Sequence, residues 1–459
     1  MEIHIIPVED VSSGDKFIIY RPLVGLAFVG NRAMVDLALA LADEAEARHL
    51  SANGSGAAME FLQTIGFLAT DPTLLDPVGS AFRPTTAVLL LTNQCQLRCV
   101  YCYAAASALS RHDLSPELGY AAIDYVCQTA MELGQSHFDL SFHGGGEPTF
   151  AWKVLQACTD YARQKPLPAR ITLTSNAAWS SSQRDWIIAN IDSLSISVDG
   201  TPETQNLQRP FVSGRGSSDI VMGNIKALDR HGIPYGLRLT ATGPWKQIPE
   251  DMRFICRETR CQVMQIEPAF NSLPGGHGVP EAADCQAFAE AFLEAFEVAV
   301  RARRRLYYSG ARPGVVTTKF CAAPYNALIV NADGNLVTCY EVDKKTHPLA
   351  GISTIGRIEN RQVMIDEAAR KRLHTLLDER RASCRGCFCY HTCAGDCYTR
   401  TFQSGPTGHL AHGPRCDMNR AITREMLLGF ISGSRGVWLG LGHQPPANQI
   451  SPVSEVAVS

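Results

Sequence analysis

Apolar and polar positions change their spacing in a regular order between residues 85 and 305. Short apolar runs, which are typical of buried strands, alternate with longer segments whose apolar residues recur at helical spacing. This order predicts right-handed βαβ units and an α/β fold with a parallel sheet. Six strands predict a partial barrel, with its active-site residues on the loops that follow the strands. The expected strands are 87–91, 138–142, 170–174, 193–198, 235–240 and 263–267, and the expected helices include 116–133, 152–163, 220–230 and 283–300.

The pattern differs on both sides of this region. Residues 1–82 predict a small separate module in which short strands (17–20, 25–29) precede amphipathic helices (33–43, 57–65). After the barrel, the chain is rich in cysteine, glycine and turn residues up to about residue 424. It then becomes polar and rich in proline and serine. We therefore expect domains at 1–82, 83–312 and 313–430, followed by a flexible tail at 431–459.

Composition narrows the class of protein. A chain of 459 residues with 45% hydrophobic and 19% charged residues is typical of a globular protein of two or three domains. The net charge of -3 gives no reason to expect nucleic acid or an anionic membrane as the main partner. We find no secretory signal and no apolar run long enough to span a bilayer. The 16 cysteines therefore indicate metal binding or catalysis in the cytoplasm rather than disulfides.

Three of these cysteines follow the first barrel strand at short spacing, as Cys95-x₃-Cys99-x-Tyr101-Cys102. Three thiolates at this spacing can hold three corners of a four-iron cluster, and the fourth iron is then open to a small molecule. The alternative is a zinc knuckle or a group of core thiols, although zinc sites usually pair C-x₂-C with a second Cys or His pair nearby. The pattern resembles the signature of the radical S-adenosylmethionine (SAM) enzymes. The resemblance implies that the open iron binds SAM and that reductive cleavage of SAM yields a 5′-deoxyadenosyl radical.

A second motif, His143-Gly-Gly-Gly-Glu147-Pro148, follows the second strand. Glycines let backbone approach a ligand closely, and the block resembles the GGEP motif that binds the methionine part of SAM in that family. By this resemblance Gly145, Gly146 and Glu147 bind SAM, with Glu147 near the ammonium group. Loop capping or strand packing remains the alternative for the other matching positions. These further SAM-binding candidates are Tyr101, Ser175, Asn176, Ser197, Arg209 (near the SAM carboxylate), Gln265 and Ile266, and Arg238 is expected to face the ligand.

The C-terminal cysteines form a third pattern, which resembles the SPASM domain of radical SAM peptide and protein maturases. This resemblance implies two auxiliary iron–sulfur clusters. One would be held by Cys384, Cys387, Cys393 and Cys416, and the other by Cys321, Cys339 and Cys397. The second set is one ligand short. Either Cys389 fills the gap or that cluster has an open iron.

Together these resemblances imply a partial (β/α)₆ TIM-like radical SAM barrel with a small N-terminal module and a cysteine-rich SPASM iron–sulfur domain. The module loosely resembles the winged-helix elements that bind leader peptides, although a purely structural extension is the alternative. The function implied is modification of a ribosomally synthesised peptide, by a C–C, C–S or similar cross-link at an unactivated carbon. Its partners would be the peptide and an electron donor such as flavodoxin or ferredoxin. The alternatives are a sulfatase-maturating type of enzyme, which makes formylglycine, and a non-catalytic iron–sulfur electron carrier.

Overall fold

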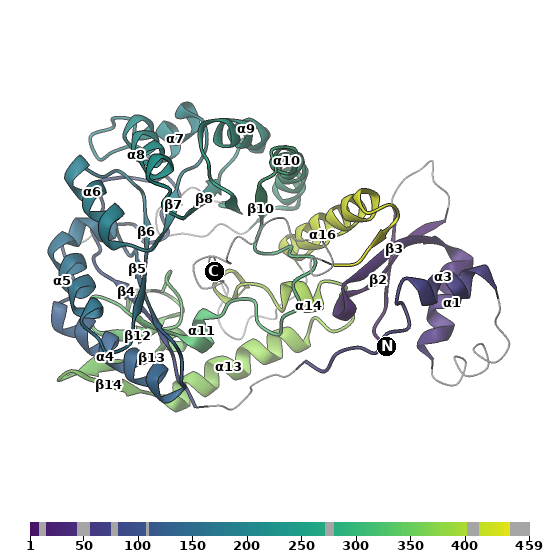
Figure 1. Ribbon diagram of the computed structural model, residues 1–459, viewed down its shortest axis with the longest axis horizontal. Coiled ribbons are helices and arrows are strands. Elements are labelled where there is room, and N and C mark those ends of the chain that lie inside the picture. Colours follow the sequence, from purple (N-terminus) through teal and green to yellow (C-terminus); the bar gives the residue numbers. More distant parts are fainter. Residues whose placement is uncertain are drawn as a thin grey trace.

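The computed structural model describes residues 1–8, 15–43, 56–74, 81–106, 110–270, 280–342, 344–401 and 413–440 (Figure 1). Its largest element is an eleven-stranded sheet in the order β10-β9-β8-β7-β6-β5-β4-β11-β12-β13-β14. The strands from β10 to β11 in this order are all parallel. The six predicted strands are confirmed as β4 (Thr86–Leu90), β5 (Phe138–His143), β6 (Ala169–Ser175), β7 (Ser193–Ser197), β8 (Tyr235–Ala241) and β9 (Val263–Pro268).

Helices cover the outside of the curved sheet (Figure 1). Their ends follow local chemistry: Ser180 and Gln183 form a capping box at the start of α6, and Gly232 ends α8 in the left-handed conformation. Apolar helix faces, with Val126, Leu155 and Ile225 among their members, are buried against the strands in one continuous core. The helices are α4 (Pro116–Glu132), α5 (Trp152–Arg163), α6 (Ser181–Asn190), α7 (Pro202–Gln208), α8 (Ser218–His231), α9 (Ile248–Glu258) and α10 (Ala282–Arg301).

Two short strands that were not predicted extend the barrel sheet. β10 (Arg305–Tyr307) pairs with β9, and β11 (Ala327–Val330) pairs with β4 from the other side. An antiparallel ribbon of β12 (Asn335–Val337), β13 (Thr354–Glu359) and β14 (Gln362–Ile365) continues the sheet. The segment 313–430 therefore shares its sheet with the barrel. Its helices are α11 (Ala323–Asn326), α12 (Ala350–Ser353), α13 (Glu367–Ala382), α14 (Tyr390–Cys393), α15 (Tyr398–Thr401) and α16 (Pro414–Gly433).

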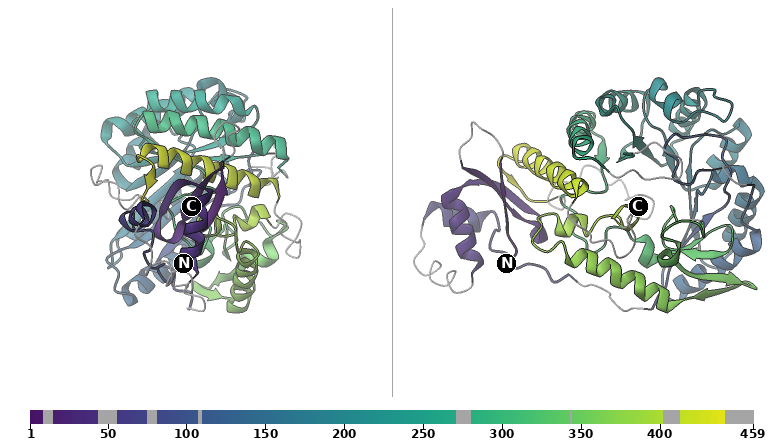
Figure 2. Two further views of the ribbon diagram at one scale, coloured as in Figure 1. Left: turned by 90° about the vertical axis from the view of Figure 1, so that its right-hand side faces the viewer. Right: turned by 180° about the vertical axis from the view of Figure 1, so that it is seen from behind.

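The N-terminal module is a four-stranded sheet in the order β1-β2-β3-β15. Its first three strands are β1 (His4–Pro7), β2 (Lys16–Arg21) and β3 (Leu26–Asn31). Helices α1 (Arg32–Ala42) and α3 (Ala57–Thr64) pack on one face of this sheet, as the sequence predicted. The other face packs against α16, and α16 also lies beside α10 (Figure 2).

The fourth strand of the module corrects one prediction. The tail was expected to be flexible from residue 431, yet β15 (Val437–Trp438) pairs antiparallel with β3. Trp438 is 1% exposed and packs in an apolar cluster with Tyr20 and Leu427. Burial of the Trp438 indole fixes this part of the chain, although polar residues follow it in the sequence. The prediction is therefore wrong for residues 431–440, while 441–459 lie outside the described residues.

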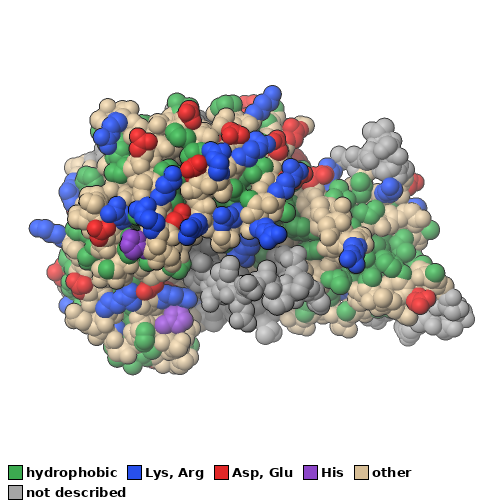
Figure 3. All heavy atoms as spheres, turned by 45° about the horizontal axis from the view of Figure 1, so that its top comes forward, with side chains coloured by type: hydrophobic (Ala, Val, Ile, Leu, Met, Phe, Trp, Pro, Cys, Tyr) green, Lys and Arg blue, Asp and Glu red, His purple; other side chains and the backbone are tan. Residues whose placement is uncertain are grey.

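The charged side chains on the surface are of both signs, as the net charge of -3 leads one to expect. Figure 3 shows Lys and Arg side chains in a loose band across the barrel face, with Asp and Glu scattered on both sides of it. Among the described residues, no helix combines the length and apolar character that crossing a bilayer requires.

Candidate functional site

A cavity of about 1830 Å³ lies where the barrel strands end and the cysteine-rich segment faces them. Active-site residues of α/β barrels occur at this end of the strands. The loops after β4 and β5, together with the ends of β6 to β9, form one part of its lining. Residues from the C-terminal segment and from α16 form another. The cavity therefore unites motifs that lie more than 200 residues apart in the sequence.

The loop after β4 brings Cys95, Cys99 and Cys102 to the cavity lining. Polar hydrogens point at two of their sulfurs. Cys95 Sγ accepts from Leu97 N–H (3.4 Å) and from Asn176 Nδ2 (3.6 Å). Cys99 Sγ accepts from Arg209 Nη1 (3.7 Å). Donors aimed at sulfur are what an anionic iron–sulfur centre needs.

The protonation of these thiols depends on a nearby cation. Burial raises the pKa of Cys95 to about 12 and that of Cys99 to about 11, although Arg209 acts to lower the pKa of Cys99. Both thiols therefore keep their protons at neutral pH without further positive charge. Iron would supply that charge and hold the thiolates, so this donor set fits a cluster bound by three cysteines.

The glycine loop after β5 is fastened directly to the start of the cysteine loop. Gly146 N–H donates to Thr92 O (2.6 Å), and Glu147 N–H donates to Gln94 O (2.8 Å). A Cβ atom at Gly146 would lie 2.0 Å from Gln94 O, so a side chain would force the two loops apart. Gly145 and Gly146 both line the cavity. The structure thus brings the two predicted motifs together.

Glu147 ties the glycine loop to the end of β6. Its Oε1 accepts from Ser175 Oγ (2.6 Å) and Thr149 Oγ1 (2.8 Å), and its Oε2 accepts from Asn176 N–H (2.8 Å). Burial raises the pKa of this carboxyl, and the donors act against that increase. Ser175 Oγ also accepts from Trp179 Nε1 (2.8 Å), so its hydroxyl serves the protein's own structure. The predicted contact of Glu147 with the SAM ammonium stays a prediction.

A buried ion pair between Asp199 and Arg209 contacts the cysteine loop. The Asp199 side chain is 0% exposed, and its Oδ2 lies 3.0 Å from Arg209 Nε. Tyr101 Oη donates to the same oxygen (2.6 Å), and Thr240 N–H donates to Oδ1 (3.0 Å). The Arg209 guanidinium also lies 5.3 Å from the centre of the Tyr101 ring. Arg209, predicted to meet the SAM carboxylate, thus already has a carboxylate partner.

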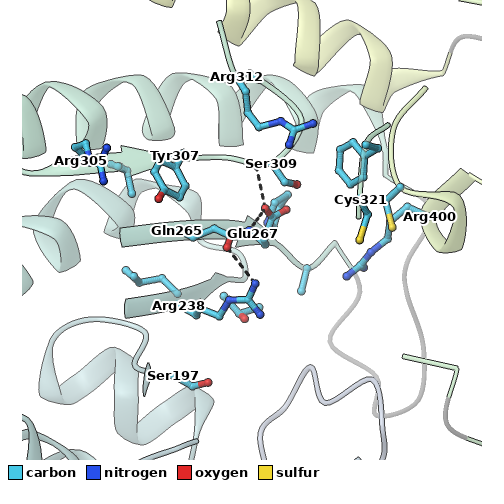
Figure 4. Close-up of a pocket in the computed structure, with 18 of the residues that line it drawn as sticks. Ser197, Arg238, Gln265, Glu267, Arg305, Tyr307, Ser309, Arg312, Cys321 and Arg400 are labelled. Carbon is cyan, nitrogen blue, oxygen red and sulfur yellow. Dashed lines mark hydrogen bonds between the residues drawn. The ribbon is translucent and has the colours of Figure 1, made fainter. Parts of the chain in front are cut away.

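The strands β8 and β9 contribute a polar wall (Figure 4). Arg238 Nη2 donates to Gln265 Oε1 (3.2 Å), and Gln265 Nε2 donates to Glu267 Oε1 (3.0 Å). Ser309 N–H donates to the same Glu267 oxygen (3.0 Å). Ser197, Gln265 and Arg238 line the cavity as expected. Ile266 does not: its side chain is 2% exposed and belongs to the main apolar core.

A stacked pair connects the glycine loop to the C-terminal segment. The His143 and Tyr340 rings lie 4.3 Å apart and nearly parallel. Burial, helped by Arg238, lowers the pKa of His143 to about 3, so the ring is neutral at neutral pH. Its Nδ1 accepts from Gly144 N–H (2.9 Å), and the proton therefore sits on Nε2. Tyr340 directly follows Cys339, so the stack places the glycine loop against a cysteine of the C-terminal segment.

Cys321, Cys339 and Cys397 also line the cavity. Glu341 is the carboxylate beside this set. Its backbone N–H donates to Cys339 Sγ (3.5 Å), and its carboxylate accepts from Arg400 Nη2 (2.9 Å) and Thr399 Oγ1 (3.1 Å). Burial and then Glu341 raise the pKa of the Cys339 and Cys397 thiols. Positive charge from iron would offset both effects.

The remaining cysteines of the predicted pattern gather around α16. Cys416 Sγ accepts from Arg380 Nη2 (3.7 Å), and Cys393 Sγ accepts from Asn419 Nδ2 (3.6 Å). Cys389 lies with this group: it hydrogen-bonds to Cys387, whose pKa is lowered by that bond. The structure therefore does not bring Cys389 to the incomplete set at Cys321.

Arg312 is a buried cavity residue that no sequence motif indicated. Its Nε and Nη2 are buried without a hydrogen-bond partner among the described residues. Burial lowers the pKa of Arg312, and Cys393, Cys321 and Glu267 act against that decrease. Buried donors of this kind need acceptors, and the inorganic sulfides of an auxiliary cluster would provide them. Across the described residues, no three His, Cys, Asp or Glu side chains are arranged to hold a single metal ion.

Sequence reasoning missed three site residues: Arg312, Glu341 and Arg400. They depend on contacts between distant segments. Asp199 belongs to a stretch, Ser195 to Gly200, that resembles family positions around the SAM ribose and carboxylate, and the structure pairs its carboxylate with Arg209.

A parallel α/β barrel that presents three cysteines and a glycine loop to one cavity agrees with the resemblance to the radical SAM enzymes. Residues 89–255, just over a third of the chain, match the sequence profile of the radical SAM superfamily. The superfamily implies a [4Fe–4S] cluster and SAM.

Two curated proteins resemble parts of the chain. Fe-coproporphyrin III synthase of Methanosarcina barkeri is 29% identical over 151 residues, which are 33% of this chain and 35% of that protein. An uncharacterized protein of Methanocaldococcus jannaschii is 26% identical over 171 residues, 37% of this chain and 56% of that protein. The matched parts thus span about a third and just over half of these relatives.

Solved structures resemble more of the fold. The structure of anSMEcpe with bound AdoMet has a TM-score of 0.60 at 16% identity, and the match covers 76% of this chain and 99% of that chain. Native anSMEcpe with bound AdoMet and the Kp18Cys peptide has a TM-score of 0.58 over the same shares. At this identity the likeness concerns the fold, and it confirms the predicted fold class.

Proposed function

We propose that this chain is a radical SAM/SPASM maturase that forms a C–C or C–S cross-link at an unactivated carbon of a ribosomally synthesised peptide. One observation carries the proposal: Cys95, Cys99 and Cys102 line the same cavity as Cys321, Cys339 and Cys397. Ligand pockets of about 300–1,000 Å³ suffice for small molecules. A volume of about 1830 Å³ leaves room for SAM and a peptide segment together.

The residues present fit three iron–sulfur clusters. Cys95, Cys99 and Cys102 would hold the cluster that binds SAM, and the two C-terminal sets would hold auxiliary clusters. The first cluster would supply the electron that cleaves SAM to the hydrogen-abstracting radical, and an auxiliary cluster would accept the electron left after the link closes. The chain's own part is to orient the loops through Asp199 and Glu147 and to enclose the peptide. Arg238 and Gln265 lie where they can position it.

The N-terminal module would recruit the leader of the peptide. It is fixed to α16, whose residues Met426 and Phe430 line the cavity. A peptide held by the module would therefore have its core segment close to the cysteine sets. The other partner is an electron donor such as flavodoxin or ferredoxin, and the cytoplasm provides the reducing conditions.

The test is anaerobic incubation of the reconstituted protein with SAM, a reductant and a short peptide encoded beside its gene. We expect 5′-deoxyadenosine and a peptide lighter by two hydrogens, with tandem mass spectrometry locating the link. A Cys99→Ala variant that stays folded should yield neither product. If the peptide is unchanged while 5′-deoxyadenosine accumulates, the proposed substrate is wrong.

The second candidate is a sulfatase-maturating type of enzyme, which the fold likeness to anSMEcpe favours. It predicts conversion of a Cys or Ser to formylglycine. The Cys reaction differs from a cross-link in mass because sulfur is replaced by oxygen. The Ser reaction loses two hydrogens, as a cross-link does, so it is distinguished by hydrazine trapping of the aldehyde and by its fragment ions. A non-catalytic electron carrier would bind iron and yield no 5′-deoxyadenosine at all. The same mass-spectrometry experiment separates the three outcomes.

A further inference from the structure

We infer that residues 207–215, together with Arg98, form the docking surface for an acidic one-electron donor protein. This rests on the proposed function, which requires one electron for each SAM molecule cleaved. The electron passes from the donor to the cluster held by Cys95, Cys99 and Cys102, so the donor is oxidised by one electron and the cluster is reduced by one. The cavity side of that cluster is reserved for SAM and substrate. A protein cannot enter a cavity of about 1830 Å³, so the electron must arrive through the opposite side of the cysteine loop.

The segment 207–215 pairs with the cysteine loop, and Arg209 is its one residue that lines the cavity. Arg98 N–H donates to Pro210 O (2.8 Å), Val100 N–H donates to Gln208 O (3.0 Å), and Val212 N–H donates to Gln96 O (3.0 Å). These bonds run on both sides of Cys99. The segment 207–215 is therefore bonded directly to the cluster loop, and electron transfer through protein weakens steeply with each added layer.

This segment also carries the most exposed large apolar side chains of the described part of the chain. Leu207 is 72% exposed and Val212 is 58% exposed. Single exposed apolar residues are ordinary, but apolar residues rimmed by charge mark interaction sites. Here the rim is Arg98 and Arg215, both exposed. Arg98 Nη1 donates to the backbone oxygens of Cys95 and Leu97 in its own loop, and Arg215 lies over the Phe211 ring, 5.0 Å from its centre.

The charge of this surface indicates which kind of protein would dock on it. The two paired segments, 93–100 and 206–218, contain three arginines and no aspartate or glutamate. One of these arginines, Arg209, is neutralised by Asp199. The exposed pair leaves a positive, partly apolar surface beside the cluster loop, within a chain whose net charge is -3. Complementary charge steers encounter and sets its salt dependence, so the surface fits an acidic redox protein.

The experiment compares two reductants on the full reconstituted protein. Titanium(III) citrate is small and needs no docking surface, whereas reduced flavodoxin must dock. The variants are Leu207→Glu and Arg215→Glu, which reverse the character of the surface without touching a cysteine or the cavity lining. The controls are Met131→Glu, at a site 52% exposed near the end of α4, and Arg230→Glu near the end of α8. Helices of βα units run back along the strands, so these controls lie at the opposite end of the barrel.

We expect all four variants to form 5′-deoxyadenosine with titanium(III) citrate at rates within about twofold of wild type. With flavodoxin, Leu207→Glu and Arg215→Glu should lose about tenfold in kcat/KM for the donor, while the controls should not. Raising the salt concentration should slow the wild-type flavodoxin reaction and affect Arg215→Glu less. The inference is overturned if the surface variants match the controls with flavodoxin. It is also overturned if they lose equally with both reductants, or if wild type accepts electrons from titanium(III) citrate alone. Failure of wild type with titanium(III) citrate would instead contradict the proposed function.

Discussion

The buried pair of Asp199 and Arg209 yields the sharpest prediction about stability. Asp199→Asn keeps the shape of the side chain and one acceptor oxygen but removes the charge. Arg209 then remains as a positive group, 8% exposed, without its carboxylate. Removing one partner of a buried ion pair costs about 3–5 kcal/mol, because the other charge stays desolvated. We expect a loss of that size in the free energy of unfolding.

The assay is urea unfolding of the apo protein under anaerobic conditions, followed by tryptophan fluorescence. Four of the five tryptophans belong to the barrel, so the fluorescence reports mainly on that domain; they are Trp152, Trp179, Trp186 and Trp245. The midpoint should fall while the slope stays constant, since the surface exposed on unfolding does not change.

A double-mutant cycle identifies the cause of the loss. Asp199→Asn/Arg209→Gln removes both charges, so it should recover about 1–3 kcal/mol relative to the sum of the single changes. Tyr101→Phe is the matched control, because it removes one hydrogen bond to the same carboxylate and should cost only about 1 kcal/mol. A loss below about 1 kcal/mol in Asp199→Asn, or full additivity in the cycle, would refute the reasoning.

Three other predictions follow from the same structure. Replacing Cys321 or Cys384 by Ala should each remove the iron of one auxiliary set and spare the other, as iron content and Mössbauer spectra would report; loss of both sets together would contradict the two-group arrangement. Trp438→Ala should cost about 3–5 kcal/mol and expose the N-terminal module to limited proteolysis, because the indole is 1% exposed; unchanged proteolysis would contradict this. Burial acts to raise the pKa of Glu2, but hydrogen bonds to His391 and His4 outweigh it and lower that pKa below 4.5. The contact is therefore fully stabilising above about pH 4.5 and is lost as pH falls through the folded pKa, so the module's unfolding midpoint should stay level down to about pH 4.5 and then fall below it in wild type, and fall less in Glu2→Gln.

The barrel was predictable because its information is local. Each strand from β4 to β9 is an apolar run between helical segments, and the observed bounds differ from the predicted ones by at most one residue at either end. β10 and β11 were missed because they are three and four residues long and are defined by distant partners. β15 was missed for the same reason, since pairing of Val437 with Phe28 leaves no local trace in the sequence.

The same distinction between local and long-range information applies to the site residues. The cysteine and glycine motifs are contiguous, so their residue types and spacing predicted a shared cavity. Glu341 and Arg400 act through a contact between segments 59 residues apart, which no spacing reveals. The expectation for Ile266 could have been avoided: successive strand residues face opposite sides, so Gln265 and Ile266 cannot both line the cavity.

The pairing of β15 with β3 has a consequence for synthesis of the protein. The first three strands leave the ribosome more than 400 residues before the strand that completes their sheet. Until then β3 presents an unpaired edge, and such edges promote association between chains. Chains released early, just before Val437, would therefore be expected to aggregate through their first strands, whereas full-length chains would bury that edge.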